Sequence, residues 1–257
     1  MKKNLLISLP LLAAFAAPAF AADDPLSFNV SAVSDYRYRG ISQTRLKPAL
    51  QGGVDYALPA GFYIGAWGST IKWIKDNGVD GSVEVDLYGG YRGEIRKDLG
   101  YDLGVLQYAY VGNKLADTAG GGVYKNADTT ELYGALTWGP VTGKLSYALT
   151  NLFGNYNFAT DESTHGSTYA ELNGSFDLGS GFSLAPHIGH QTVSHLGVAS
   201  YTDYSATVSK DLGSGLSVAA AAVGTDADKS FYVPGAAAGS TRFLGKPALV
   251  VSLKATF

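Results

Sequence analysis

The chain closes with Leu249-Val250-Val251-Ser252-Leu253-Lys254-Ala255-Thr256-Phe257, in which apolar residues recur at every second position. One face of an extended strand here carries Leu249, Val251, Leu253, Ala255 and Phe257, and the other carries Ser252, Lys254 and Thr256. A period of two is typical of a strand with one apolar and one polar surface. The end of the chain is therefore predicted to be an amphipathic strand.

The same alternation recurs along the chain after Pro25. Each segment is close to the ~9–11 residues that a tilted strand needs to cross a bilayer. Twelve strands are predicted, at residues 26–39, 48–58, 62–73, 82–92, 101–111, 128–139, 141–151, 168–178, 182–193, 201–212, 216–224 and 247–257.

The connections between these segments alternate in length. Five are short turns, at residues 59–61, 93–100, 139–140, 177–181 and 211–215. Six are longer, polar and glycine-rich, at residues 40–47, 74–81, 112–127, 152–167, 194–200 and 225–246. A soluble sandwich has Greek-key connections without this alternation. The pattern predicts an all-β fold, a closed antiparallel up-and-down transmembrane β-barrel of about 12 strands, with short periplasmic turns and longer external loops.

Aromatic residues mark one rim of the predicted barrel. They flank the short turns on the apolar face, as an interfacial girdle requires. The residues are Tyr56, Phe62, Tyr91, Tyr101, Trp138, Phe176 and Phe182, with Phe28 and Phe257 at the two ends of the strand series.

Residues 1–21 have the composition of a cleaved secretory signal peptide, which leaves residues 22–257 for the barrel. Lys2 and Lys3 precede an apolar stretch, and Ala19-Phe20-Ala21 is an A-x-A cleavage site. Within residues 22–257 there is no apolar run of about 18 residues, so no helix is predicted to span a bilayer.

The composition excludes several classes of protein. The 257 residues include no cysteine, which rules out disulfide-stapled folds, thiol catalysis and zinc–cysteine sites. Apolar residues make up 46% of the chain, too many for a disordered protein. A net charge of -3 lacks the basic stripe expected of a protein that binds nucleic acid.

A resemblance to a known family is carried by residues 34–69. Ser34-Asp35-Tyr36-Arg37-Tyr38-Arg39-Gly40-Ile41-Ser42-Gln43-Thr44 continues into Pro48-Ala49-Leu50-Gln51-Gly52-Gly53-Val54-Asp55-Tyr56, and then Gly61-Phe62-Tyr63-Ile64-Gly65-Ala66-Trp67-Gly68-Ser69. Together these segments resemble the TorF-type porin family of Gram-negative outer membranes. The resemblance implies an outer-membrane β-barrel with a porin role and brings no catalytic residues. The C-terminal Phe257 likewise resembles the signal read by the outer-membrane assembly machinery.

If the apolar faces contact lipid, the polar faces line the lumen. In the first strand Asp35, Arg37 and Arg39 are expected to point inward, while Tyr36 and Tyr38 point outward. The predicted pore-lining residues are Asp35, Arg37, Arg39, Gln51, Asp55, Glu84, Asp86, Arg92, Glu131, Lys144, Glu171 and His187.

The two arginines are expected to contact Asp55, Glu84 or Asp86 across adjacent strands, because a guanidinium offers a fork of donors to carboxylates. Opposed charges in a lumen either bias which solutes pass or pair to plug the interior. Twelve strands lie between the filled eight-stranded barrel and the open porin of 16–18 strands, so both interpretations stay open.

Signals for catalysis and metal binding are weak. Ser194 and His195 are a candidate serine–histidine pair because some outer-membrane barrels are lipid hydrolases, yet adjacent residues on a strand face opposite sides. His187, His190 and His195 lack the spacing of a metal site, and no cofactor is implied.

The function predicted from the sequence is an outer-membrane porin-like channel, not an enzyme, for passive diffusion of small hydrophilic solutes or ions. Its expected partners are outer-membrane lipid, lipopolysaccharide, those solutes and the outer-membrane assembly machinery, with no nucleic acid. Two alternatives are a closed barrel with a structural, receptor or adhesion role carried by its external loops, and a barrel lipid hydrolase at Ser194 and His195.

Overall fold

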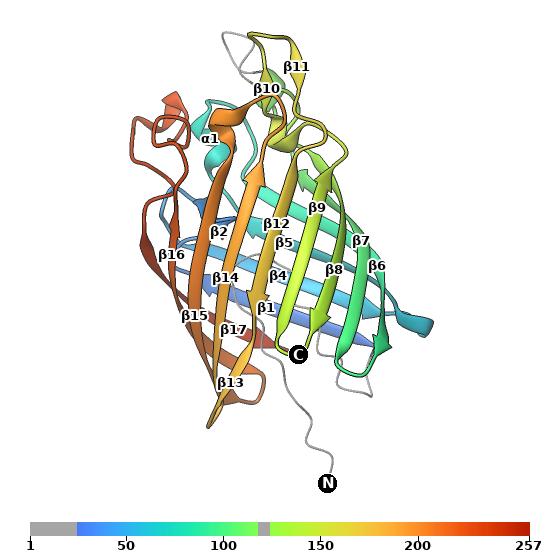
Figure 1. Ribbon diagram of the computed structural model, residues 1–257. Helices are drawn as coiled ribbons and strands as arrows, with labels where there is room; N and C mark the ends of the chain where they lie inside the picture. The colour runs from blue at the N-terminus through green and yellow to red at the C-terminus, as the bar shows by residue number, and fades with distance from the viewer. Residues whose placement is uncertain (1–24, 118–123) are drawn as a thin grey trace.

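The structure is a computed structural model that describes residues 25–117 and 124–257. Its main element is one antiparallel sheet that closes on itself (Figure 1). The predicted signal peptide, residues 1–21, lies outside the described residues.

Each wall strand pairs with the next wall strand along the chain, and the first pairs with the last. Val30 lies opposite Ala255, so β1 and β17 complete the ring. The strands are β1 (Leu26–Val33), β4 (Ala49–Ala57), β5 (Phe62–Thr70), β6 (Val83–Arg96), β7 (Leu99–Tyr110), β8 (Thr129–Trp138), β9 (Val141–Ala148), β12 (Thr168–Gly174), β13 (Phe176–Gly179), β14 (Phe182–Thr192), β15 (Tyr201–Gly213), β16 (Leu216–Thr225) and β17 (Ala248–Thr256).

Because β12 and β13 both pair with β14, they occupy one position in the wall, and the ring has twelve positions in the described chain. The predicted fold class, a closed antiparallel barrel of about 12 strands, is therefore confirmed.

Short turns join the strands at one end of the barrel, here called the short-turn end, where β17 also ends (Figure 1). The opposite, long-loop end carries α1 (Trp73–Asp76) and the small hairpin β10 (Tyr156–Asn157) to β11 (Glu162–Ser163). In the described part of the chain, 3-10 turns lie at Pro59–Gly61, Leu115–Asp117, Leu152–Gly154, Gly197–Ala199 and Ala236–Ala238. Within the described ranges, no helix is both long and apolar enough to span a membrane.

The first predicted strand, residues 26–39, is wrong beyond Val33. After that residue the chain leaves the wall and forms a separate hairpin of β2 (Arg37–Tyr38) and β3 (Ile41–Ser42). Positive φ angles of 44° at Arg39 and 77° at Gly40 make the bend between these two strands. The alternation in this stretch therefore belongs to a hairpin inside the barrel.

Other boundaries also differ from the prediction: the strand predicted at 141–151 ends at Ala148, and the strand predicted at 168–178 is divided into β12 and β13. The wall strand predicted at 62–73 ends at Thr70, because the chain turns into α1. The link predicted at 93–100 is much shorter, because β6 continues to Arg96 and β7 begins at Leu99. A positive φ of 65° at Asp98 allows this tight turn.

The outer surface of the wall is apolar. Leu50, Trp138 and Leu249 are 68%, 72% and 70% exposed. Near the short-turn end the rings of Phe62 and Tyr91 lie 4.8 Å apart, centroid to centroid. The exposed aromatic residues here are Phe28, Tyr56, Phe62, Tyr91, Trp138, Phe176, Phe182 and Phe257.

On the inner surface of the described chain, four tyrosine rings cover glycines of the neighbouring strand. Tyr63 covers Gly90, Tyr88 covers Gly65, Tyr133 covers Gly104 and Tyr169 covers Gly189. A Cβ atom at any of these glycines would enter the space of the ring. The glycines therefore let large side chains fill the interior without pushing the wall apart.

Gly104→Ala tests this packing. A Cβ there would meet the Tyr133 ring and lie 2.8 Å from the Gly89 carbonyl oxygen. We expect the free energy of unfolding to fall by about 1–3 kcal/mol, the usual cost of overpacking. Urea denaturation followed by tryptophan fluorescence measures it. Gly100→Ala, on the same strand, is the control, since its nearest neighbour is the Gly93 carbonyl oxygen at 3.4 Å. Equal losses in the two variants would contradict the packing role.

Candidate functional site: the barrel interior

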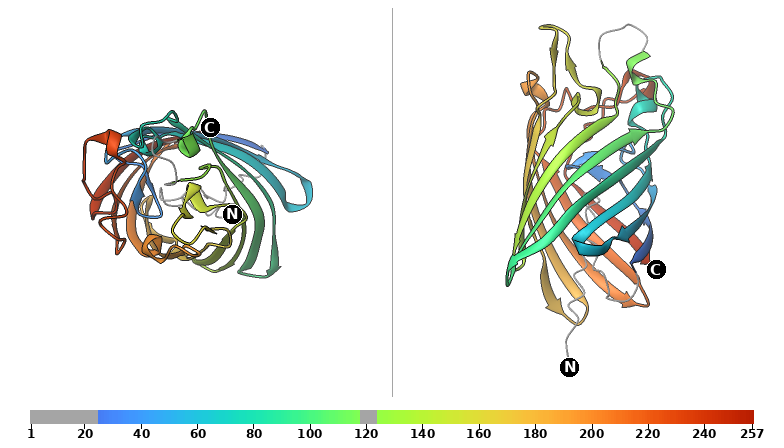
Figure 2. Two further views of the ribbon diagram at one scale, coloured as in Figure 1. Left: turned by 90° about the horizontal axis from the view of Figure 1, so that it is seen from above. Right: turned by 90° about the vertical axis from the view of Figure 1, so that its right-hand side faces the viewer.

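Residues 34–47, here called the inward segment, fold into the barrel near its long-loop end. Figure 2 shows this segment, in blue, inside the ring of strands. Tyr36 is buried and Tyr38 packs against Tyr108 and Phe153 on the inner side. The expectation that Tyr36 and Tyr38 face outward is therefore wrong, because these residues belong to the inner hairpin and not to the wall.

Arg37 fastens the inward segment to the loop before β17. Its Nε atom lies 2.6 Å from an Asp35 carboxylate oxygen. Its Nη1 atom donates to the carbonyl oxygens of Gly40 and Leu244, both at 2.9 Å, and of Lys246 at 3.2 Å. Arg37 is only 2% exposed, and all of these contacts are within the protein. Its role is therefore to hold the inward segment in place.

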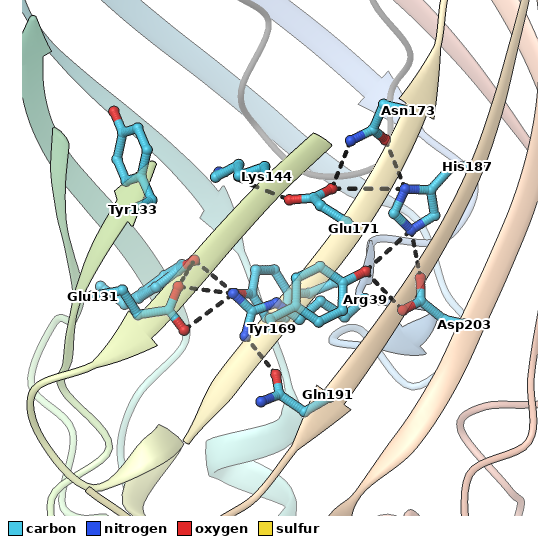
Figure 3. Close-up of polar contacts among 12 residues, drawn as sticks. Arg39, Glu131, Tyr133, Lys144, Tyr169, Glu171, Asn173, His187, Gln191 and Asp203 are labelled. Carbon is cyan, nitrogen blue, oxygen red and sulfur yellow. Dashed lines mark hydrogen bonds and ion pairs between the residues drawn. The ribbon is translucent and has the colours of Figure 1, made fainter. Parts of the chain in front are cut away.

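Arg39 fastens the tip of the segment to the opposite wall. Its Nη2 atom donates to both carboxylate oxygens of Glu131, at 3.0 and 2.8 Å, and its Nη1 atom donates to Gln191 at 2.5 Å (Figure 3). The guanidinium also lies 4.1 Å from the centre of the Tyr169 ring. These contacts join β8, β12 and β14 through one cation.

The loop between β16 and β17 covers this arrangement from the long-loop end. Tyr232 donates to the Ala199 carbonyl oxygen at 2.5 Å, and the Leu244 amide donates to the Tyr232 carbonyl at 2.9 Å. At the start of the loop, hydrogen bonds from the Ser230 side chain and from the backbone amides of Phe231 and Ser230 hold the pKa of Asp228 below its usual value. The Leu244 carbonyl that Arg37 binds is thus held in place by the loop.

A second network lies nearer the middle of the barrel. The His187 Nε2 atom is 2.9 Å from Asp203 and 3.1 Å from the Tyr169 hydroxyl, and its Nδ1 atom is 2.7 Å from Asn173 (Figure 3). Glu171 lies 3.7 Å from His187 and 3.9 Å from Lys144. Acidic, basic and neutral groups therefore alternate along β9, β12, β14 and β15.

Burial of the charged residues changes along the barrel axis. Near the long-loop end, around the inward segment, charged side chains are buried: Asp35, Arg37, Arg39, Glu84, Asp86, Glu131 and Asp203. Toward the short-turn end they are half-buried: Asp55, Arg92, Asp102 and Lys254. The interior is therefore more open toward the short turns and narrowest beside the inward segment.

A small void marks this narrow level. Its volume is about 10 Å³, and Arg39, Tyr169, His187 and Asp203 are among the residues around it. That space is enough for about one water molecule.

The twelve predicted pore-lining residues lie on the inner side but do not all meet. Arg37 and Arg39 pair with Asp35 and Glu131, so their expected contacts with Asp55, Glu84 or Asp86 are wrong. Those contacts assumed that both arginines stood in the wall beside β4 and β6. Gln51 lies within reach of Ser31 and Ser69 on its neighbours, at 3.4 and 3.3 Å.

The pore-lining residues predicted from the sequence did not include the interior tyrosines. Tyr63, Tyr88, Tyr108, Tyr133 and Tyr169 each donate to, or share a hydrogen bond with, another interior polar group. A signal was present in the sequence, because Tyr88 has the same strand phase as Glu84 and Asp86.

The candidate catalytic pair does not form. The Nδ1 atom of His195 donates to the Ser163 carbonyl oxygen at 2.7 Å, and the Ser194 amide donates to the Ser167 hydroxyl oxygen at 3.0 Å. Across residues 25–117 and 124–257, no hydrogen bond joins Ser194 to His195, and no group of three histidine or acidic residues is arranged to hold a metal ion.

Glu131→Gln tests the Arg39 anchor. The variant leaves a buried guanidinium without its carboxylate, and loss of one partner from a buried pair costs about 3–5 kcal/mol. We expect a clear fall in the urea midpoint. Glu162→Gln is the matched control, since Glu162 is exposed and lies 4.0 Å from His195, and exposed pairs contribute about 0–1 kcal/mol. Similar midpoints for the two variants would show that the anchor is dispensable.

Solved structures with this architecture include outer-membrane porins. The KdgM porin has a TM-score of 0.53 at 4% identity, with 90% of this chain and 98% of that chain covered. The NanC porin has a TM-score of 0.51 at 10% identity and the same coverage. A KdgM porin in complex with disordered oligogalacturonate gives a TM-score of 0.52 at 6% identity. At such identities the likeness shows a shared barrel fold.

Sequence comparison places the chain in a family. No curated protein matches it. The TorF-type resemblance is not confirmed. A family model described as "Bacterial protein of unknown function (Gcw_chp)" matches residues 19–257, which include the whole barrel. The chain therefore belongs to the Gcw_chp family of bacterial proteins.

Proposed function

We propose that this protein is a porin-like channel for passive diffusion of small hydrophilic solutes or ions. The observation that carries the proposal is the enclosed polar interior, in which charged and tyrosine side chains line a ring whose outer surface is apolar. A lumen of this kind offers a path for water and solutes through a bilayer, and the charges on its wall bias what passes. No covalent step or cofactor enters the proposal.

The inward segment sets the size of the path. It occupies the interior near the long-loop end, where the void beside Arg39 measures about 10 Å³. Toward the short turns, Asp55, Asp102 and Lys254 are only half-buried, which supports a wider vestibule there. The proposed solutes are accordingly ions and small molecules.

We further propose that the barrel lies in the outer membrane. The apolar belt with its aromatic rim suits the outer membrane, with lipid and lipopolysaccharide around it and the long loops outside the cell. Residues 1–21 would direct export. The backbone of Phe257 pairs with Phe28, while its ring is 78% exposed and free to meet the assembly machinery. Membership of the TorF-type porins is part of this proposal and rests on residues 34–69.

A closed barrel is the second candidate. The water-sized void and the arginine anchors of the inward segment favour it, because together they leave little space at the narrow level. In that case the long loops would carry a structural, receptor or adhesion role.

Conductance separates the two candidates. The purified, refolded protein is added to a planar bilayer in 1 M KCl, and single-channel steps are recorded. A channel predicts small, uniform steps. Arg39→Ser removes the guanidinium from the narrow level and is expected to enlarge the steps, whereas Arg96→Ser, at the exposed end of β6, is expected to leave them unchanged. A folded protein that gives no steps would favour the closed barrel.

A further inference from the structure

The buried charges of the described chain do not balance. Among the charged residues that are buried there are six carboxylates, but only two arginines, Arg37 and Arg39. The carboxylates belong to Asp35, Asp76, Glu84, Asp86, Glu131 and Asp203.

Four of these carboxylates have a donor of their own. Asp35 is paired with Arg37, Glu131 with Arg39, and Asp76 with Arg45 of the inward segment. Asp203 accepts a hydrogen bond from Tyr169 at 2.8 Å and lies 2.9 Å from His187. The remaining two buried carboxylates, Glu84 and Asp86, are therefore the ones without a basic partner.

Glu84 and Asp86 lie two residues apart on the inner face of β6, near the long-loop end. Glu84 is 2% exposed and Asp86 is 4% exposed. One oxygen of Glu84 accepts from the Tyr36 hydroxyl at 3.3 Å, but its Oε2 atom has no hydrogen-bond partner, and neither does the Oδ1 atom of Asp86. Among the residues that the structure describes, no ion pair reaches either side chain.

The other groups around the pair add no positive charge. The charged groups that act on Asp86 are the carboxylates of Glu84 and Glu131. In the wall, Asp86 lies opposite Trp67 on β5 and Tyr108 on β7, and Glu84 lies opposite Tyr110. Aromatic rings attract cations through their electron-rich faces. The surroundings of the pair are therefore suited to a cation and unsuited to an anion.

A buried carboxylate without a partner is costly, so its charge must be met by a proton or by a cation. Tyr36, which contacts Glu84, belongs to the inward segment, so the unpartnered oxygens lie where that segment meets the wall. In the proposed channel, an ion that crosses the narrow level passes this boundary, so a cation there would meet the unpartnered oxygens of Glu84 and Asp86.

We propose that Glu84 and Asp86 form a cation filter, at which monovalent cations such as K⁺ replace the missing basic partner while anions are repelled. This inference rests on the proposed channel and names the class of solute that the channel favours. The filter lies on β6, two wall positions from β8, whose Glu131 binds Arg39, and apart from the His187 network on β12, β14 and β15.

The reversal potential across a tenfold KCl gradient tests the filter. We expect the wild-type protein to favour K⁺ over Cl⁻. The isosteric double variant Glu84→Gln with Asp86→Asn is expected to lower the permeability ratio by at least roughly fivefold, the effect of removing a unit charge a few ångströms from the ion. Glu94→Gln, which removes the same charge from the exposed end of β6, is expected to leave the ratio unchanged.

The outcomes separate the filter from the channel. A folded protein without conductance steps would contradict the channel, and the filter with it. Clear steps with anion preference, or with the same ratio in the wild type and in the double variant, would contradict the filter and leave the channel standing. Cation preference that appears only in alkaline solution would show that the pair holds protons at neutral pH, which also overturns the filter. If the double variant does not refold, the two single variants decide the same question.

Discussion

Backbone hydrogen bonding is the constraint on which the rest of this structure depends. In hydrocarbon an unpaired amide or carbonyl group costs several kcal/mol, so a sheet that crosses a bilayer has to close. Pairing of β1 with β17 meets this demand. Closure fixes which surface of each strand is outside, and the strict alternation of side chains then separates an apolar exterior from a polar interior.

Closure of twelve strands also creates a space that wall side chains do not fill by themselves. Tyrosines over glycines fill part of it. The inward segment fills more, and its three arginines bring the cations that buried carboxylates need: Arg37 for Asp35, Arg39 for Glu131 and Arg45 for Asp76. The same segment thus narrows the lumen and compensates much of its negative charge. None of these three arginines pairs with Glu84 or Asp86, and each of these two carboxylates keeps an oxygen without a hydrogen-bond partner.

Most of the wall could be predicted from the sequence, because a period of two is a local signal and the connections alternate in length. Residues 34–39 show where this reasoning fails. Asp35, Arg37 and Arg39 keep the alternation of a wall strand, yet they form an inner hairpin that positive φ angles at Arg39 and Gly40 allow. The partners of the arginines could not be predicted either, since Arg39 meets Glu131 and Gln191 across 92 and 152 residues. Strand phase identifies which charges face inward, but it does not say which of them pair.

The central claim is that the apolar face of the wall contacts lipid and the polar face encloses the interior. Two single-tryptophan variants in brominated-lipid vesicles test it most directly. One keeps Trp138, which is 72% exposed on the outer surface, and the other keeps Trp67, which packs against Tyr36 inside. The remaining tryptophans are replaced by phenylalanine. We predict strong quenching of Trp138 fluorescence and little quenching of Trp67 fluorescence. Equal quenching of both, or stronger quenching of Trp67, would contradict the account.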